Sequence, residues 1–583
     1  MPGFIPVFRQ ELGKRNLVGN IEKLKGAFHS MKKWFAVLLA IVCLFGVLSI
    51  GNAEERVKVK AADGTEFYET GLPIVDPDQD VELTIWGVTS ASDPNTFEMC
   101  KKYEEETGIH INWIGVSQDG LEERKNLMWA SGDYPDILGP SIPNDSDINM
   151  YGPMGIIIPL NEYIDKYLNT FRANCGGEEV WNNVWGKLTY PDGNIYAFPT
   201  VMDYFNCDNT VPSINIDWLE KLGMKMPETP DEFVEYLRAV KTQDPNGNGK
   251  ADEIPFVTQN WRGIFESYAV AGWTGELAGI KYIEDGKVVY PVSSDAVKEA
   301  ARWLHQIYEE GLMDPEIYTQ DENMMKGKAQ GDELIYGFST VWREGNVFGE
   351  KNSLSYFPMK PLQGKDGKRL WYGTKDRSLV SSQWCVTSAC KYPEIAARFV
   401  DYLYDPLMSL QSDYGPVGIA LEEQADGTYK QITPAGYSTI AEWFIDNHFQ
   451  QMPRLEIGTF LTCNDGKGIL YTDPEQLTWT QMTERYTAEI GGYQKNVQDM
   501  IVGEYVTTAF PGVKPTQEET DELQLLEGDF TKYVEESLTR FVTGEMSIDN
   551  DWDAYVQRVN ELGYERLMAI YQQQYDRYVS GLN

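Results

Sequence analysis

The stretch VELTIWGVTSASDPNTFEMCKKYEEETGIHINWIGV, residues 81–116, decides the fold class of this chain. Its two ends, VELTIWGV and IHINWIGV, are rich in apolar, β-branched and aromatic residues, which is the composition of buried strands. Between them, a turn at Asp93 and Pro94 leads into a run of helix-forming residues that stops at Gly108. A helix that connects two neighbouring strands makes them parallel, so this stretch predicts a β-α-β unit.

The next residues add a second helix and a third strand to this unit. The helical run is LEERKNLMWASGD (121–133), and the strand lies within YPDILG (134–139). Parallel sheets of this kind bind ligands in the crevice at the carboxyl ends of their strands. We therefore expect a binding crevice at that edge of the sheet.

Helical and strand patterns alternate along the rest of the chain. Amphipathic helices are predicted in WLEKLG, DEFVEYLRAVKTQ, DAVKEAARWLHQIYEEG and PEIAARFVDYLYD, and strands in ELIYGF and SLVSSQWCV. From about Glu518 onward nearly every residue fits a helical pattern. The expected fold class is therefore α/β with a helical C-terminal extension.

The size and charge of the chain limit its possible partners. It has 583 residues and a formal net charge of -39 at pH 7, which argues against nucleic acid or an anionic membrane surface as a direct partner. Hydrophobic residues make up 42% of the chain, enough for large cores and at least two lobes. With 16 Trp and 34 Tyr, the protein has many planar side chains on which a ligand could stack.

The N-terminal part has the pattern of a secretory signal. Lys32 and Lys33 precede the apolar run Trp34–Ile50, and the small residues Gly51 and Ala53 follow it. We expect export to an extracellular, cell-surface or periplasmic location, and Gly51 and Ala53 have the spacing that a signal peptidase recognises, although cleavage after Ala53 itself is left open by the sequence. The apolar run is close to the length of a membrane span, so an uncleaved anchor is the alternative.

Cysteine and histidine give little indication of chemistry. No two of the cysteines after Ala53 form a CxxC pair, and both disulfides and free buried thiols remain open in an exported chain. The four histidines are scattered and match neither a zinc site nor a His-based catalytic triad. The six cysteines concerned are Cys100, Cys175, Cys207, Cys385, Cys390 and Cys463.

The stretch DPNGNGKADEIP, residues 244–255, has the oxygen donors of a calcium loop. Asp244, Asn246 and Asn248 occupy positions 1, 3 and 5 of an EF-hand-like loop, and the glycine at position 6 allows the sharp turn. Lys250 at position 7 offers its backbone carbonyl. Position 12, which carries a bidentate Glu in a true EF-hand, is Pro255 here. The alternative is a plain turn whose polar side chains face water.

Several segments in the same order resemble one protein family. WASGDYPDIL, the long segment 216–255, EEGLMDPEIYTQ, SDYGPVG and DWDAYVQRVNELGYERLMAIYQQQYDRY are similar to segments of extracellular solute-binding proteins of sugar-type ABC importers, of the large oligosaccharide-binding type known as family 1. The resemblance extends from about Val81 to Tyr578. It implies a type II periplasmic-binding-protein-like fold, with two parallel-sheet α/β lobes joined by hinge strands.

The resemblance also implies approximate domain boundaries. Residues 1–53 would be an N-terminal extension and signal segment, and residues 54–80 a linker. The first lobe would consist of residues 81–203 and 380–422. The second lobe would consist of residues 204–379 and 423–583.

For the DPNGNGKADEIP stretch, the resemblance favours a compact calcium loop with a structural role. In this family's larger members an adjacent Asp-Glu pair completes the ligand shell, and Asp252 and Glu253 match that pair. The predicted metal ligands are Asp244, Asn246, Asn248, Lys250, Asp252 and Glu253, and the predicted cofactor is Ca²⁺.

The sugar-contacting residues are expected among aromatic and polar side chains near strand or helix ends. A sugar presents apolar C–H faces to aromatic rings and polar edges to amides, carboxylates or Arg. Each aromatic residue taken singly fits a core position as well as a ligand position, whereas Trp218 and Trp552 fit the core. The candidates are Trp86, Asp93, Trp261, Trp273, Trp342, Arg343 and Tyr414.

The function predicted by this resemblance is extracellular capture of an oligosaccharide and its delivery to an ABC permease, by a monomer that binds no nucleic acid. Ligand contacts with both lobes would favour the closed form, as in the hinge closure of periplasmic binding proteins. The alternatives are a peptide-binding or sensor-coupled solute-binding protein and a secreted glycoside hydrolase that uses two carboxylates. The chain has no nucleophile elbow, HExxH or Walker motif, so we expect a binding protein and not an enzyme.

Overall fold

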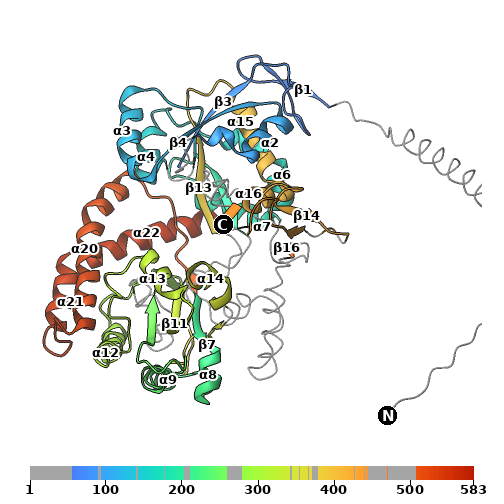
Figure 1. Ribbon diagram of the computed structural model, residues 1–583. Coiled ribbons are helices and arrows are strands. Elements are labelled where there is room, and N and C mark those ends of the chain that lie inside the picture. Colours follow the sequence, from blue (N-terminus) through green and yellow to red (C-terminus); the bar gives the residue numbers. More distant parts are fainter. Residues whose placement is uncertain are drawn as a thin grey trace, which may run out of the picture. The chain divides into compact units, whose positions relative to one another are not determined.

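The computed structural model describes most of the chain beyond residue 55 (Figure 1). It divides the chain into a small unit, of which residues 56–59 and 68–71 are described, and a large unit that contains all other described residues. The described residues are 56–88, 93–139, 142–175, 177–202, 211–258, 279–341, 344–353, 355–365, 367–370, 379–425, 427, 429–438, 440, 442–443, 469–470 and 507–582. The predicted signal segment lies outside them.

The predicted linker, residues 54–80, contains folded chain. It includes the short strands β1 (Lys58–Lys60) and β2 (Glu66–Tyr68). In the large unit, Phe67, Ile74 and Val75 are fully buried, and the Phe67 ring lies 5.8 Å from the Tyr167 ring. Apolar burial of this kind makes Phe67, Ile74 and Val75 part of the core of the large unit.

A five-stranded sheet contains the predicted β-α-β unit. Its order is β4-β3-β5-β13-β6, and the strands β3 (Glu82–Val88), β4 (His110–Val116) and β5 (Ile137–Leu138) run parallel, as predicted. The other two strands, β13 (Leu379–Val386) and β6 (Phe198–Met202), pair antiparallel with each other, and β13 also pairs antiparallel with β5. The sheet is therefore mixed, because β13 joins it after a long excursion of the chain.

Three helices of this part were predicted from the sequence: the one that stops at Gly108, the one in LEERKNLMWASGD and the one in PEIAARFVDYLYD. The stop at Gly108 is confirmed: it adopts φ 75°, and a Cβ there would lie 2.3 Å from the Val75 carbonyl oxygen. The turn at Asp93 caps the short 3-10 helix η1 (Pro94–Thr96), and the α-helix starts separately at Glu98. The helices are α2 (Glu98–Thr107), α3 (Leu121–Ser131), α4 (Asp145–Tyr151), α5 (Asn161–Tyr167), α6 (Asn169–Asn174), α7 (Glu178–Leu188), α15 (Pro393–Leu403) and α16 (Pro406–Tyr414).

A second, four-stranded sheet has the order β12-β7-β11-β8. β8 (Ile254–Thr258) and β11 (Tyr336–Val341) are parallel, and β7 (Val211–Asn215) and β12 (Tyr356–Pro358) complete the sheet. Helix α9 (Pro230–Gln243) begins with a capping box between Thr229 and Glu232, with Pro230 at its first position. The other helices here are α8 (Ile216–Leu222), α12 (Asp295–Glu309), α13 (Glu322–Ala329) and α14 (Glu344–Ser353).

Three C-terminal helices complete the core around the second sheet (Figure 1). α20 (Gln517–Thr543) packs along α12, and α21 (Trp552–Glu561) and α22 (Tyr564–Leu582) follow it. Their apolar faces share one hydrophobic cluster with Trp218 and the second sheet. Trp218 is 0% exposed and Trp552 is 3% exposed, so the prediction that both are core residues is confirmed.

The chain leading into α20 contacts α4, and α22 contacts α7. The buried Lys514 places its Nζ 2.8 Å from Asp145 Oδ1, which accepts a further hydrogen bond from the Tyr190 hydroxyl at 2.6 Å. At the same end of the bundle, where Arg577 donates to the Lys514 carbonyl at 3.1 Å, the Tyr578 hydroxyl donates to Asn183 Oδ1 at 2.6 Å. The C-terminal extension is therefore tied by polar contacts to helices that surround the five-stranded sheet.

Two further sheets have three strands each. β9 (Tyr282–Glu284) pairs with β10 (Lys287–Val289) and with β17 (Thr508–Ala509). β15 (Tyr429–Gln431) pairs with β14 (Leu421–Glu423) and β16 (Ile469–Leu470).

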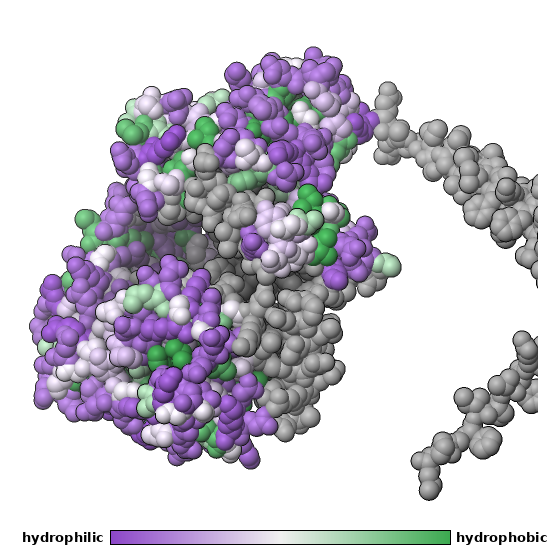
Figure 2. All heavy atoms as spheres, viewed as in Figure 1, coloured by the Kyte–Doolittle hydropathy of each residue, from purple (hydrophilic) through white to green (hydrophobic). Residues whose placement is uncertain are grey.

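The described surface is mainly polar. Hydrophilic residues cover most of it on the face shown in Figure 2, and apolar residues are scattered among them. Among the described residues, no helix is both long and apolar enough to cross a membrane. The described cysteines Cys100, Cys175, Cys385 and Cys390 form no disulfide bond, and the first three are buried. Of the two alternatives left open by the sequence, thiols without a disulfide hold at those four positions.

Candidate functional site

The carboxyl end of β3 carries the first predicted ligand residue, Trp86. Its side chain is 7% exposed and belongs to an apolar cluster that includes Trp129 and Tyr196. The Arg124 guanidinium lies 5.5 Å from the Trp86 ring, a cation–π arrangement. In this structure Trp86 is mainly a packing residue at the sheet edge, and only a small part of its ring faces outward.

Asp93 and Tyr414 lie at helix ends, as the sequence predicts. Asp93 is exposed, and its carboxylate accepts hydrogen bonds from Asn95 N and Nδ2, both at 3.0 Å. Tyr414 is half-buried at the last position of α16 and precedes Gly415, which adopts φ 98°. A Cβ at Gly415 would lie 2.5 Å from Ala420 Cβ, so only glycine fits this turn.

The other four predicted ligand residues, Trp261, Trp273, Trp342 and Arg343, lie outside the described residues. The strands that lead to two of them are described. β8 ends at Thr258 and β11 ends at Val341, and these strands are parallel neighbours. The Thr340 hydroxyl donates to Thr258 Oγ1 at 2.6 Å, so the segments toward Trp261 and Trp342 leave the sheet from the same edge.

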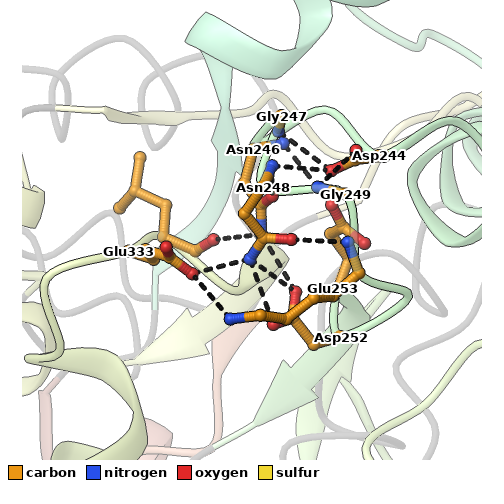
Figure 3. Close-up of polar contacts among 10 residues, drawn as sticks. Asp244, Asn246, Gly247, Asn248, Gly249, Asp252, Glu253 and Glu333 are labelled. Carbon is orange, nitrogen blue, oxygen red and sulfur yellow. Dashed lines mark hydrogen bonds and ion pairs between the residues drawn. The ribbon is translucent and has the colours of Figure 1, made fainter.

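The predicted calcium loop follows α9 and has the backbone of a tight oxygen-lined turn (Figure 3). Asp244 adopts φ 47°, and its carboxylate accepts hydrogen bonds from the amides of Gly247 (2.9 Å), Asn248 (3.1 Å) and Gly249 (2.9 Å). Both glycines have positive φ values, 78° and 77°, which is why residues without a Cβ occupy them. The sequence therefore bends the chain around the Asp244 carboxylate.

The two asparagines of the loop have fixed orientations. Asn246 Oδ1 accepts from Asn248 N at 2.9 Å, and Asn248 Oδ1 accepts from Lys250 N at 2.8 Å. Their amide nitrogens turn toward Asp252: Asn246 Nδ2 donates to its Oδ1 at 3.1 Å, and Asn248 Nδ2 donates to both of its oxygens at 3.2 and 3.1 Å. These donors, Asn246 first, lower the pKa of Asp252.

Negative charge is concentrated at the end of the loop. Burial raises the pKa of Glu253, and the neighbouring carboxylates of Asp244 and Asp252 raise it further. A cation in the loop would relieve this repulsion. In the described part of the chain, no group of three or more His, Cys, Asp or Glu side chains is arranged to hold a metal ion. A cation here would therefore depend on amide and backbone oxygens as well as carboxylates.

Glu333 is a contact of this loop that the sequence did not predict. It belongs to the segment before β11, and its Oε2 accepts a hydrogen bond from Asn248 Nδ2 at 2.6 Å (Figure 3). Lys250 Nζ lies 3.9 Å from the same oxygen. The next residue, Leu334, accepts from Asn246 Nδ2 through its carbonyl at 3.3 Å. The sequence gives little indication of this contact, because the segment ELIYGF predicts only a strand and its Glu333 lies 85 residues from Asn248.

A surface hollow of about 460 Å³ lies between α9 and α12. Its charged walls include Arg238 and Arg302, but these guanidinium groups already pair with Glu310 at 2.6 Å and with Asp549 at 2.9 Å. None of its lining residues is a predicted ligand residue. The strand ends and the 244–253 loop are therefore the better candidate sites.

The family model of the bacterial extracellular solute-binding protein matches residues 98–412, more than half of the chain. The chain belongs to this family. Its members are carriers that bind solutes and are not enzymes, and their fold has two lobes.

Individual relatives cover nearly the whole chain. The fructooligosaccharide ABC transporter substrate-binding protein FusA of Streptococcus pneumoniae is 29% identical over 521 residues, which cover 86% of this chain and 90% of that protein. A solved structure of FusA in complex with kestose is 28% identical, has a TM-score of 0.65, and matches 86% of this chain and 99% of its own. A FusA EF-hand mutant in complex with fructo-nystose is 27% identical, with the same TM-score of 0.65 and the same coverages of 86% and 99%.

Proposed function

We propose that this protein is the extracellular substrate-binding component of an ABC importer and that it captures an oligosaccharide. This proposal is supported mainly by the similarity to FusA, in sequence and in fold, which extends over 86% of this chain. Membership of a solute-binding family supports it further. The ligand would be held at the carboxyl ends of β3, β8 and β11, where the described strands lead to predicted aromatic and polar contact residues.

The mechanism that follows is capture by closure. An oligosaccharide that contacts both lobes only in the closed form stabilises that form by its extra contacts. Trp86, Asp93 and Tyr414 would act from the first lobe, and Trp261, Trp273, Trp342 and Arg343 from the second. The closed protein would then be recognised by a membrane permease, as an exported monomer that binds no nucleic acid.

Thermal unfolding in the presence of candidate ligands tests this function. A ligand that binds only the folded protein raises its melting temperature, and at 100 times its Kd it adds about 2.7 kcal/mol of stability. We expect a clear rise with one class of oligosaccharide, with kestose and longer fructooligosaccharides as the first probes. Monosaccharides and short peptides serve as comparisons, and stabilisation by peptides alone would overturn the oligosaccharide assignment.

We further propose that residues 244–253 hold a structural Ca²⁺. The donor set fits a hard cation: the side-chain oxygens of Asp244, Asn246, Asn248, Asp252 and Glu253 and the backbone carbonyl of Lys250. The presence of three carboxylates, those of Asp244, Asp252 and Glu253, within one short loop supports the same assignment. The cation would supply positive charge to this loop and no chemistry.

The position of the loop explains what a structural ion would do. The loop leads directly into β8 at Ile254, whose amide donates to the Ile335 carbonyl at 2.6 Å beside the start of β11. The ion would therefore hold the amino ends of β8 and β11, at the edge opposite the predicted ligand residues. It would stabilise the lobe without touching the sugar.

Removal of calcium is expected to lower the melting temperature of the protein. The comparison is EDTA-treated protein against the same protein with Ca²⁺ restored, with Mg²⁺ as the control ion. Asp252→Asn keeps an oxygen acceptor for Asn246 and Asn248 but removes a charge, so we expect it to reduce the response to Ca²⁺ and to leave the metal-free melting temperature nearly unchanged. Identical melting curves of the wild-type protein with EDTA and with Ca²⁺ would rule the ion out.

A further inference from the structure

The contact between Glu333 and Asn248 joins the 244–253 loop to a segment far away in the sequence. Asn248 Nδ2 lies 2.6 Å from Glu333 Oε2, which is shorter than its two contacts with Asp252, at 3.2 and 3.1 Å. Glu333 is half exposed, with its side chain at 50% relative accessibility. A short hydrogen bond from an amide to a half-exposed carboxylate is charge-assisted and therefore orients the amide group.

The orientation of the Asn248 amide decides which of its atoms is offered to a cation. Its oxygen accepts from Lys250 N at 2.8 Å, on the side of the loop backbone, and its nitrogen faces the carboxylates of Asp252 and Glu333. An amide rotated by 180° would present two N–H donors in place of an oxygen lone pair. A carboxylate fixed on the nitrogen side therefore keeps the oxygen available on the other side.

Neighbouring contacts connect the Glu333–Asn248 contact to the four-stranded sheet. Leu334 accepts from Asn246 Nδ2, and Ile335 accepts from Ile254 N, so residues 333–335 run alongside the loop and continue the β8–β11 pairing. Lys250 Nζ, at 3.9 Å, also faces Glu333 and reduces the repulsion between Glu333 and Asp252. Figure 3 shows Glu333 on the side of Asn248 away from Asp244.

We propose that Glu333 is a positioning residue of the cation loop: by accepting from Asn248 Nδ2 it orients the Asn248 oxygen as a calcium ligand and so raises the affinity of the loop for Ca²⁺. This inference rests on the proposed calcium site. Outer partners that orient metal ligands typically contribute about 10- to 100-fold to metal affinity, which sets the scale of the effect.

Calorimetric titration of the full protein with CaCl₂ after EDTA treatment and desalting tests the proposal with three variants. Glu333→Ala removes the acceptor and the charge, and we expect its Kd for Ca²⁺ to rise about 10-fold. Glu333→Gln removes the same charge but keeps an oxygen that can accept from Asn248, so its Kd is expected to rise by less, about 2- to 3-fold, a partial rescue. Asp332→Asn changes the charge by one unit at the neighbouring exposed position and is the matched electrostatic control.

The outcomes separate the possible explanations. Equal losses in Glu333→Ala, Glu333→Gln and Asp332→Asn would reduce the role of Glu333 to general electrostatic attraction and overturn the proposal. Wild-type affinity in Glu333→Ala would also overturn it, while leaving the calcium site itself intact. Absence of calcium binding by the wild-type protein would instead refute the calcium site on which the proposal rests. The melting temperatures of the metal-free variants show whether the substitutions damage the fold.

Discussion

Replacing Tyr555 by alanine is expected to destabilise the core around the four-stranded sheet by about 3–5 kcal/mol, the usual cost of truncating a large buried aromatic residue. Tyr555 is 0% exposed in α21, and its ring lies 5.5 Å from Phe541 and 5.1 Å from Trp552. Its hydroxyl donates to the Val292 carbonyl at 2.7 Å, which ties the C-terminal helices to the chain before α12. Differential scanning calorimetry should show a fall in melting temperature of about 10 °C.

The Tyr555→Phe variant is the matched control for this prediction. It keeps the ring and removes only the hydrogen bond to Val292, so its cost should be about 1 kcal/mol. If the alanine and phenylalanine variants lose equal stability, the packing of the Tyr555 ring does not contribute to the stability of the shared core. The comparison therefore tests whether the helices beyond residue 517 are an integral part of the core around the four-stranded sheet.

The second large loss of stability is expected when Asp401, in the core around the five-stranded sheet, is replaced by alanine. Asp401 is 0% exposed, and its carboxylate accepts from Thr170 N at 3.1 Å and Phe171 N at 3.0 Å, at the start of α6. Arg398, itself 5% exposed, lies 3.3 Å away. Asp401→Ala leaves buried N–H groups and a buried cation without this acceptor, at a cost of about 3–5 kcal/mol in urea unfolding.

Two further substitutions show what the Asp401 result means. Burial raises the pKa of Asp401 even though the amides of Phe171 and Thr170 lower it, so a neutral isostere avoids part of the cost of burying the charge. Asp401→Asn should therefore lose less stability than Asp401→Ala. Asp405→Ala removes the cap of α16 and should cost only about 1 kcal/mol. A loss at Asp401 no larger than that at Asp405 would contradict the importance of the buried network.

The parts of the fold that follow from local patterns could be predicted. The alternation of apolar strands and amphipathic helices between Val81 and Leu138 correctly indicated three parallel strands, because each element is recognisable from its own residues. The same holds for the turn around Asp244, since Asp, Asn and Gly have distinct backbone preferences. The helices α20 to α22 could also be predicted from their sequence.

Contacts between distant segments could not be predicted. Nothing near Asn248 indicates that Glu333 will accept its hydrogen bond, because only the parallel pairing of β8 with β11 brings the two together. Likewise, no local pattern indicates that Lys514 will pair with Asp145, because the two residues are far apart in the sequence. Trp86 illustrates a related difficulty. Its position near a strand end can be predicted from the sequence, but its burial against Trp129 and Arg124 depends on how α3 packs.

This protein is expected to bind an oligosaccharide without transforming it, and isothermal titration calorimetry measures that binding. The protein, in a buffer that contains Ca²⁺, should be titrated with kestose and with longer fructooligosaccharides, and the sugar recovered afterwards should be identified by mass spectrometry. Saturable binding of one sugar per protein is expected, with the oligosaccharide recovered intact. Absence of binding by oligosaccharides of every class, or recovery of shorter hydrolysis products, would contradict it.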